Sequence, residues 1–391
     1  MSLKNIDLTK ILQSKIIVSY PFVYDKSKVQ QLDTKNIIKL KNEMLKDFLP
    51  YTKNFFGKYH LQDDNPLTIT FPMICNSNFT RSIDFVKDNK ITQKIDINNI
   101  KLYFFEKSIA ILTIEYAIPQ NISNKEFLYY HQKLSTIEKR SKQNIRISCE
   151  KDFKYYFEFI NSIISNYVAE TNNIFCRSNL YTYSLIVANA TEQDKQIQNF
   201  IEPLLQYRNS LDEISITQSY IAFVQQVPNI YTIANENVVV HIGIKQKSCN
   251  NNFIDNEFFN KYQNNHFLTY LITLFQATKI EQLIIKAFLQ EDKNKDLKNI
   301  RFIKSEILHF IANGDFTKIS NNSIRNNLYK FYRKKFEIKD MLQEIKTVSE
   351  ELKNELENII EDKKAQTDKI RNFIIGVVGI ILAIIQTYQA F

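Results

Sequence analysis

The sequence predicts an α+β cytoplasmic domain, followed by a helical hairpin and a long stalk helix that runs into one C-terminal transmembrane helix. Three observations predict this layout. All seven prolines lie between Pro21 and Pro228, so only the first two-thirds of the chain is broken often. After about residue 250, apolar residues recur at the three-to-four spacing of helices. A charge-free apolar run then extends from Phe373 to Ile385.

The first 250 residues alternate between strand-like and helix-like stretches. Runs of β-branched and aromatic residues predict strands, and three-to-four apolar spacing predicts helices. The expected strands are residues 15–24, 67–75, 95–106, 108–119, 181–189, 220–227, 230–235 and 238–244, the third and fourth forming a hairpin. The expected helices are residues 34–56, 124–139, 150–169 and 193–210. Residues 1–250 are therefore predicted to form a mixed α/β sensor domain.

The remainder of the chain is predicted to be helical. Residues 251–321 form a helical region, with helices over 257–290 and 295–312 and a stop at Asn313-Gly314. Residues 322–372 form the stalk, since neither Pro nor Gly occurs between Ser323 and Gly376. One helix from Ser323 to Tyr388 would be about 100 Å long.

Residues 373–391 are predicted to cross a membrane. These 19 residues would span about 28 Å as a helix, close to the ~30 Å of a bilayer's hydrocarbon core. The basic residues before them (Lys363, Lys364, Lys369 and Arg371) should meet anionic headgroups and remain inside the cell. We therefore expect a single-pass, tail-anchored protein of the bacterial inner membrane with a cytoplasmic N-terminal body. The alternative is a buried helix of a soluble core.

The stalk carries a seven-residue repeat. Ile338, Ile345, Leu352 and Ile359 recur every seven residues, Val348 lies three after Ile345, and the repeat continues to Phe373. The repeat favours self-association, with Gly376, Gly379 and Ala383 packing the spans in lipid. In such an assembly Glu355 and Asp362 would form acidic rings able to hold a divalent cation, the one cofactor considered. The alternative is that this helix packs on its own domain.

Residue usage excludes several kinds of site. The chain has five glycines, three of them before the apolar run. They are too few and too scattered to form a Gly-rich phosphate loop or a nucleophile elbow. Four scattered cysteines and five scattered histidines show no metal-ligand spacing. We expect no enzyme, no catalytic residue and no resident metal. The net charge of +9 favours an anionic surface or ligand, but no direct binding of DNA or RNA is expected.

One basic patch is a candidate ligand site. Its residues are Lys139, Arg140, Lys142, Arg146 and Arg177. Ammonium and guanidinium groups at this density can bind an anionic ligand. A plain solvated loop explains the same residues equally simply.

The layout of the chain resembles the CorA-type divalent-cation channels: a mixed α/β cytoplasmic domain, antiparallel helices, and a very long helix that enters the membrane. The family's Gly-Met-Asn signature does not occur here, so the resemblance does not extend to magnesium transport. The chain is more similar to divergent CorA-like membrane effectors beside bacterial antiviral systems, including type III CRISPR loci. The segments that carry this likeness read LYFFEKSIAILTIEY (102–116), PNIYTIANENVVVHIG (228–243) and FFNKYQNNHFLTYLITLFQATKIEQL (258–283).

This resemblance implies a homo-oligomer, a pentamer by analogy with CorA, whose cytoplasmic domain binds a nucleotide-derived messenger and gates a membrane pore. The leading hypothesis is therefore an ion-channel-like or pore-type effector of antiviral defence. The alternative is a single-span tether that localises a cytoplasmic partner complex without transport. A membrane-bound hydrolase or nuclease is a third class, for which no constellation is visible.

Overall fold

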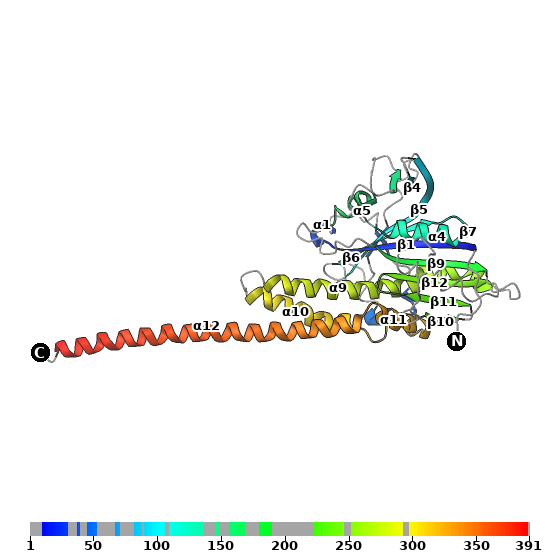
Figure 1. Cartoon of the computed structure of the whole chain (residues 1–391). Helices are drawn as coiled ribbons and strands as arrows, with labels where there is room; N and C mark the ends of the chain where they lie inside the picture. The colour runs from blue at the N-terminus through cyan, green and yellow to red at the C-terminus, as the bar shows by residue number, and fades with distance from the viewer. Residues whose placement is uncertain are drawn as a thin grey trace, which may run out of the picture. The chain divides into compact units, whose positions relative to one another are not determined.

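A computed structural model describes the chain over residues 10–29, 37–39, 45–52, 67–70, 82–87, 90–105, 109–136, 145–148, 156–168, 180–189, 223–227, 229–245, 252–291 and 297–389 (Figure 1). The chain divides into two compact units. Unit 1 comprises residues 1–279 and 316–339, and unit 2 comprises residues 280–315 and 340–391. The prediction of a mixed α+β protein with a sheet and a long C-terminal helix is confirmed.

Unit 1 is built on one sheet, whose described strands number 12. Their bounds are β1 Lys10–Val23, β2 Ile37–Lys39, β3 Leu67–Thr70, β4 Ser82–Lys87, β5 Lys90–Phe104, β6 Ile109–Ala117, β7 Ile122–Ser123, β8 Ile145–Ser148, β9 Tyr181–Asn189, β10 Phe223–Val227, β11 Ile230–Ala234 and β12 Val238–Lys245. The main order is β10-β11-β12-β9-β1-β6-β5-β3-β2. The described pairs are antiparallel except β12 with β9, and β1 lies in the middle.

One face of the sheet packs on two helices, α4 (Asn124–Ser135) and α5 (Tyr156–Ile164). The core between them includes Ile16, Val18, Leu112, Ile114 and Phe127, all nearly inaccessible to solvent. A capping box starts α4, because the Ser123 hydroxyl accepts from the Glu126 N–H and the Glu126 carboxylate accepts from the Ser123 N–H. Burial of this apolar face is the main stabilisation of unit 1.

The opposite face of the sheet packs on the helical segment that follows β12. This segment consists of α7 (Asn252–Asn256), α8 (Phe258–Lys261), the π-helix η3 (Tyr262–His266) and α9 (Phe267–Glu291). Phe267 of α9 lies 5.0 Å from the Tyr183 ring of β9, and Phe275 stacks at 4.9 Å on Phe105. Helix α11 (Ser323–Lys335) joins this layer through the Tyr329 hydroxyl, which donates to Gln276 at 3.0 Å.

Unit 2 is helical. It contains the end of α9, α10 (Leu297–Gly314) and most of α12 (Ile338–Gln389). An ion pair of 2.9 Å joins Lys286 of α9 to Glu306 of α10. The α12 side chains of Leu342, Ile345, Leu352 and Leu356 are buried, whereas every described side chain from Glu361 to Leu382 is exposed.

Two sequence-based expectations for helices are wrong. The expected helix over 34–56 contains a strand instead, because Ile37–Lys39 pairs with β3 as β2. The expected continuous helix from Ser323 breaks between α11 and α12, where Glu337 has a φ of 53°. A left-handed residue cannot continue a right-handed helix. The expected helix over 193–210 lies outside the described residues.

The remaining expected elements that fall on described residues are found. Strand β9 occupies residues 181–189 as expected, and β5 and β6 form the expected antiparallel hairpin. The helix expected over 150–169 is described as α5 over Tyr156–Ile164. In the part of the chain that is described, no helix combines the length and the apolarity that crossing a membrane requires.

Candidate functional site

Three charged side chains form a diagonal row across the centre of the sheet. Glu115 of β6 lies opposite Ile17 of β1 and Asn99 of β5. Lys15 therefore lies one diagonal step away on β1, and Lys101 one diagonal step away on β5. Their sequence neighbours Ile16, Ile114 and Leu102 belong to the core on the other face, so by strand alternation the charged residues face the helical layer. Long side chains reach one another at diagonal positions.

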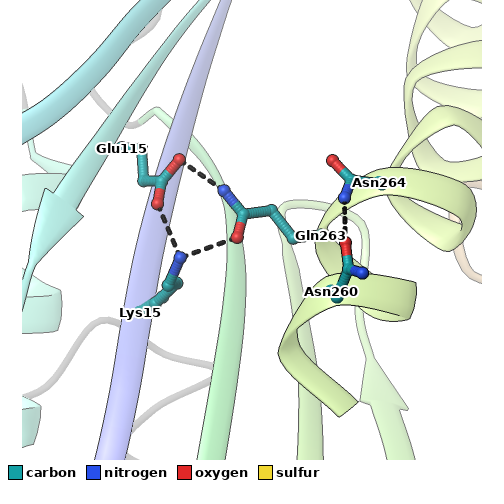
Figure 2. A network of polar contacts seen from close by, with 5 residues as sticks. All are labelled: Lys15, Glu115, Asn260, Gln263 and Asn264. Carbon is teal, nitrogen blue, oxygen red and sulfur yellow. Dashed lines mark hydrogen bonds and ion pairs between the residues drawn. The ribbon is translucent and has the colours of Figure 1, made fainter. Parts of the chain in front are cut away.

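Gln263 closes a network with two of these charges (Figure 2). The Lys15 ammonium donates to Glu115 Oε1 at 2.9 Å and to Gln263 Oε1 at 2.7 Å. The Gln263 amide donates to Glu115 Oε2 at 2.6 Å. Each member of this triangle makes two hydrogen bonds inside it, and the carboxylate is the most buried member, with a side chain that is 9% exposed. Such a closed, charge-assisted network positions its side chains firmly.

The π-helix η3 supplies the glutamine. It interrupts the helical segment at Tyr262–His266, and π-turns of this kind are frequent at functional sites. Beside it, Asn264 donates to Asn260, and the Lys15 ammonium lies 5.9 Å from the centre of the Phe259 ring. Gln263, the first residue of the polar run Gln263-Asn264-Asn265-His266, thus contacts the charged residues of the sheet.

Lys101 is held in an unusual electrostatic environment for a lysine. Burial lowers the pKa of its ammonium below the ordinary value, and the nearby Lys15 lowers it further. The Glu115 carboxylate acts in the opposite direction and raises it. The row therefore contains two ammonium groups and one carboxylate, and this arrangement can attract an anion.

A second polar cluster lies deeper in unit 1, around His241 of β12. Thr232 Oγ1 lies 2.7 Å from His241 Nδ1, and the Tyr332 hydroxyl lies 3.0 Å from His241 Nε2. The rings of Tyr183 and Tyr262 pack on the imidazole at 4.9 and 4.6 Å. Burial holds the pKa of His241 well below its ordinary value, so the ring is neutral, with one nitrogen donating and the other accepting. This closed cluster is structural, because both ring nitrogens already have partners.

Replacing Tyr332 by Phe should therefore destabilise the protein. It leaves His241 Nε2 buried with one partner fewer, at a cost of about 1–3 kcal/mol. Urea unfolding measures this loss. Tyr129→Phe is the matched control, because the Tyr129 side chain is half-buried on α4 and its loss of a hydroxyl should change the free energy of unfolding by less than about 0.5 kcal/mol. Equal stability of Tyr332→Phe and wild type would contradict this role.

Most of the predicted basic patch falls outside the described residues. Lys139, Arg140, Lys142 and Arg177 lie outside the described residues. Arg146 lies on β8, opposite Asp84 of β4, and its side chain is outside the description. Ligand binding by this patch stays a prediction.

The predicted stalk residues are mostly buried within one copy of the chain. Ile345, Val348 and Leu352 are at most 8% exposed in unit 2, Ile338 is buried in unit 1, and Ile359 is half-buried. Burial by the chain's own residues favours the second interpretation of the repeat, in which this part of the helix packs on its own chain. Whether copies of the chain associate stays a prediction.

The other predicted positions lie on the exposed part of α12. Lys363, Lys364, Lys369, Arg371 and Asp362 are exposed, and Glu355 is half-buried. A Cβ built on Gly376 or Gly379 would meet no atom within 4 Å, and the side chain of Ala383 lies outside the description. Among the described residues, no group of three or more His, Cys, Asp or Glu side chains could hold a metal ion.

Sequence reasoning missed the row of Lys15, Glu115 and Lys101. A signal was present, because Glu115 is a lone acid within the otherwise buried strand Ile109–Ala117. A charge in such a strand requires a partner. Its partners, however, come from segments 100 and 148 residues away along the chain, and only the strand register and the packing of η3 bring them together.

Comparison of the chain with family models, with curated proteins and with solved structures gave no match in any of the three.

Proposed function

We propose that this chain is a membrane-anchored effector in which the end of α12 enters a lipid bilayer and the α/β body responds to a ligand. One observation carries the proposal: between Phe373 and Leu382 the apolar side chains of α12 are exposed on all sides of the helix, Phe373 to 73%. A helix that is apolar all round is stable where another apolar phase covers it.

The charges before this segment support a bilayer as that phase. Lys363, Lys364, Lys369 and Arg371 are exposed on the two to three turns that precede Phe373. Each can gain about 1 kcal/mol near an anionic lipid surface. The apolar composition also continues beyond the described side chains, since no charged residue occurs from Ala383 to Phe391.

A pore-type assembly is the form of this proposal that the stalk pattern favours. Ile359 follows Leu356, the last buried side chain described on α12, and large apolar side chains return at Ile370 and Phe373 after the polar stretch 361–369. Gly376 and Gly379 leave open surface on which a second helix could approach closely in lipid. Several copies would then associate through the part of α12 that its own chain leaves uncovered, and their spans would surround a pore.

A single-span tether is the second candidate, and the burial of the upper stalk favours it. Since Ile345, Val348 and Leu352 are covered within one chain, this part of α12 needs no partner copy. A tether requires only that the helix end holds the body at the membrane.

Flotation of the full-length chain with liposomes tests the membrane anchor. Vesicles of phosphatidylethanolamine and phosphatidylglycerol should carry the wild type upward in a density gradient. The double variant Ile374→Lys, Ile381→Lys should remain at the bottom, because each charge at a helix centre costs about 2.5–3.5 kcal/mol on insertion. The matched control is Ile374→Leu, Ile381→Leu. Flotation of the lysine variant like wild type would overturn the anchor.

Dye release from the same vesicles separates the pore from the tether. A pore predicts release that is lost in Gly379→Leu, since leucine blocks close helix approach. A tether predicts flotation without release, and full function when residues 373–391 are replaced by an unrelated single-span anchor.

A further inference from the structure

We propose that Lys101 and Lys15 form a binding site for a small oxyanion, a phosphate group in particular, on the sheet face beside η3. If the chain acts as proposed above, this site would bind the ligand to which its α/β body responds. It does not depend on membrane insertion, because all its residues belong to unit 1.

The first argument is the balance of charge. Lys15, Glu115 and Lys101 occupy consecutive diagonal positions on β1, β6 and β5. Two ammonium groups therefore share one carboxylate at the centre of a sheet. The nearest further acid in the register is Asp96 of β5, which lies opposite Ala117 and is exposed, so water screens its charge. The partly buried row keeps an excess positive charge, which an anion would compensate.

The second argument is hydrogen-bonding capacity. Within the triangle each oxygen of Glu115 accepts one bond, and both polar atoms of Gln263 make bonds. Lys15 uses two of its three donors there. In the described part of the chain, no side-chain hydrogen bond or ion pair engages the Lys101 ammonium, although its side chain is half-buried. A phosphate oxygen would supply this partly desolvated ammonium with a charged acceptor.

The third argument is spacing. Each diagonal step between adjacent strands covers about 7–8 Å, so the bases of Lys15 and Lys101, which are two such steps apart, lie on the order of 15 Å apart. Their flexible stems can bring both ammonium groups onto one small tetrahedral anion above Glu115. A long polyanion such as nucleic acid would require many more cations along its path than this row offers.

The site adjoins η3, whose contact with the sheet would change when an anion binds. Lys15 holds Gln263, and η3 leads directly into α9. An anion that draws Lys15 toward Lys101 competes with the Lys15–Gln263 bond at the π-turn. Binding would therefore alter the contact between the sheet and the start of this helix.

Calorimetric titration of the detergent-solubilised full chain with inorganic phosphate tests the site, with sodium chloride of equal ionic strength as the reference. We expect saturable binding that weakens at least about tenfold in Lys101→Met and in Lys15→Met, since each loses a charge-assisted bond. The matched control Lys94→Met removes an exposed lysine from the same strand and should bind like wild type. Absence of saturable binding, or unaltered binding by Lys101→Met, would overturn the proposal.

A second measurement avoids dependence on how the variants fold. Limited acetylation of wild-type amines, read by mass spectrometry, should slow several-fold at Lys101 and Lys15 when phosphate is present, and should be unaffected at Lys94. Equal protection of all three lysines would mean a nonspecific salt effect and would overturn the site. Liposome flotation does not enter either measurement, so failure of the membrane anchor and failure of the anion site can be told apart.

Discussion

Acidification from about pH 7 to about pH 4 should lower the free energy of unfolding by about 3 kcal/mol through His131 alone. This side chain is 1% exposed in α4, and burial lowers its pKa to about 3 from an ordinary value of 6.5. The folded pKa is the lower one, so between these values the unfolded state binds more protons. Stability contributed by the neutral ring is complete above about pH 6.5 and is lost as the pH falls towards 3.

Urea unfolding across this pH range measures the effect. His131→Gln should remove this share of the dependence, about 3 kcal/mol, because a glutamine does not titrate. His309→Gln, which replaces an exposed histidine of α10, should leave the dependence unchanged. His266 acts in the same direction as His131, since burial lowers its pKa to about 3 as well. A stability that is flat between about pH 6.5 and 4 would show that His131 is not buried in the neutral form.

Replacing Ile345 by Ala should destabilise unit 2 by about 2–5 kcal/mol, because the Ile345 side chain is fully buried. It is buried within a single copy of the chain, so the loss should be the same at every protein concentration. Chemical unfolding of the detergent-solubilised chain over a wide concentration range measures both properties. Lys346→Ala, an exposed neighbour on α12, should cost less than about 0.5 kcal/mol.

The opposite result would change the interpretation of the stalk. If the loss in Ile345→Ala grew on dilution, the side chain would contribute to contacts between copies, since oligomer stability depends on concentration. The upper half of the repeat would then be an intermolecular seam, and the burial within one chain would not describe the assembled protein.

Local patterns predicted those elements whose own residues determine their structure. Strand β9 is rich in β-branched and aromatic residues, and its bounds agree with the expectation. The helix predicted over residues 34–56 was wrong because Ile37, Leu40 and Met44 follow helical spacing, whereas Ile37–Lys39 forms a strand through pairing with β3. The helix break at Glu337 could not be predicted either, since a left-handed residue that is neither Gly nor Asn has no local sequence signature.

The candidate site could not be predicted from the sequence for a different reason. Lys101 and Glu115 belong to the two strands of the expected hairpin, but Lys15 and Gln263 come from β1 and a π-helix, and nothing in their spacing indicates contact with Glu115. A shift of one residue in the pairing of β5 with β6 would turn Lys101 to the other face. The register of the sheet therefore determines the site, and register depends on the packing of the entire core.

The central position of β1 has a consequence for synthesis. Of the described strands of the sheet β1 is translated first, yet one of its two main neighbours, β9, pairs with it across 170 residues, as between Lys15 and Leu185. At about 5–20 residues per second, β1 waits roughly 10–30 s for β9 to emerge. During that interval its apolar edge is open to other nascent chains. Strand β1 is thus the segment of the sheet for which a chaperone that binds nascent chains would matter most, and β1 gains its second main neighbour only after Asn189 has been translated.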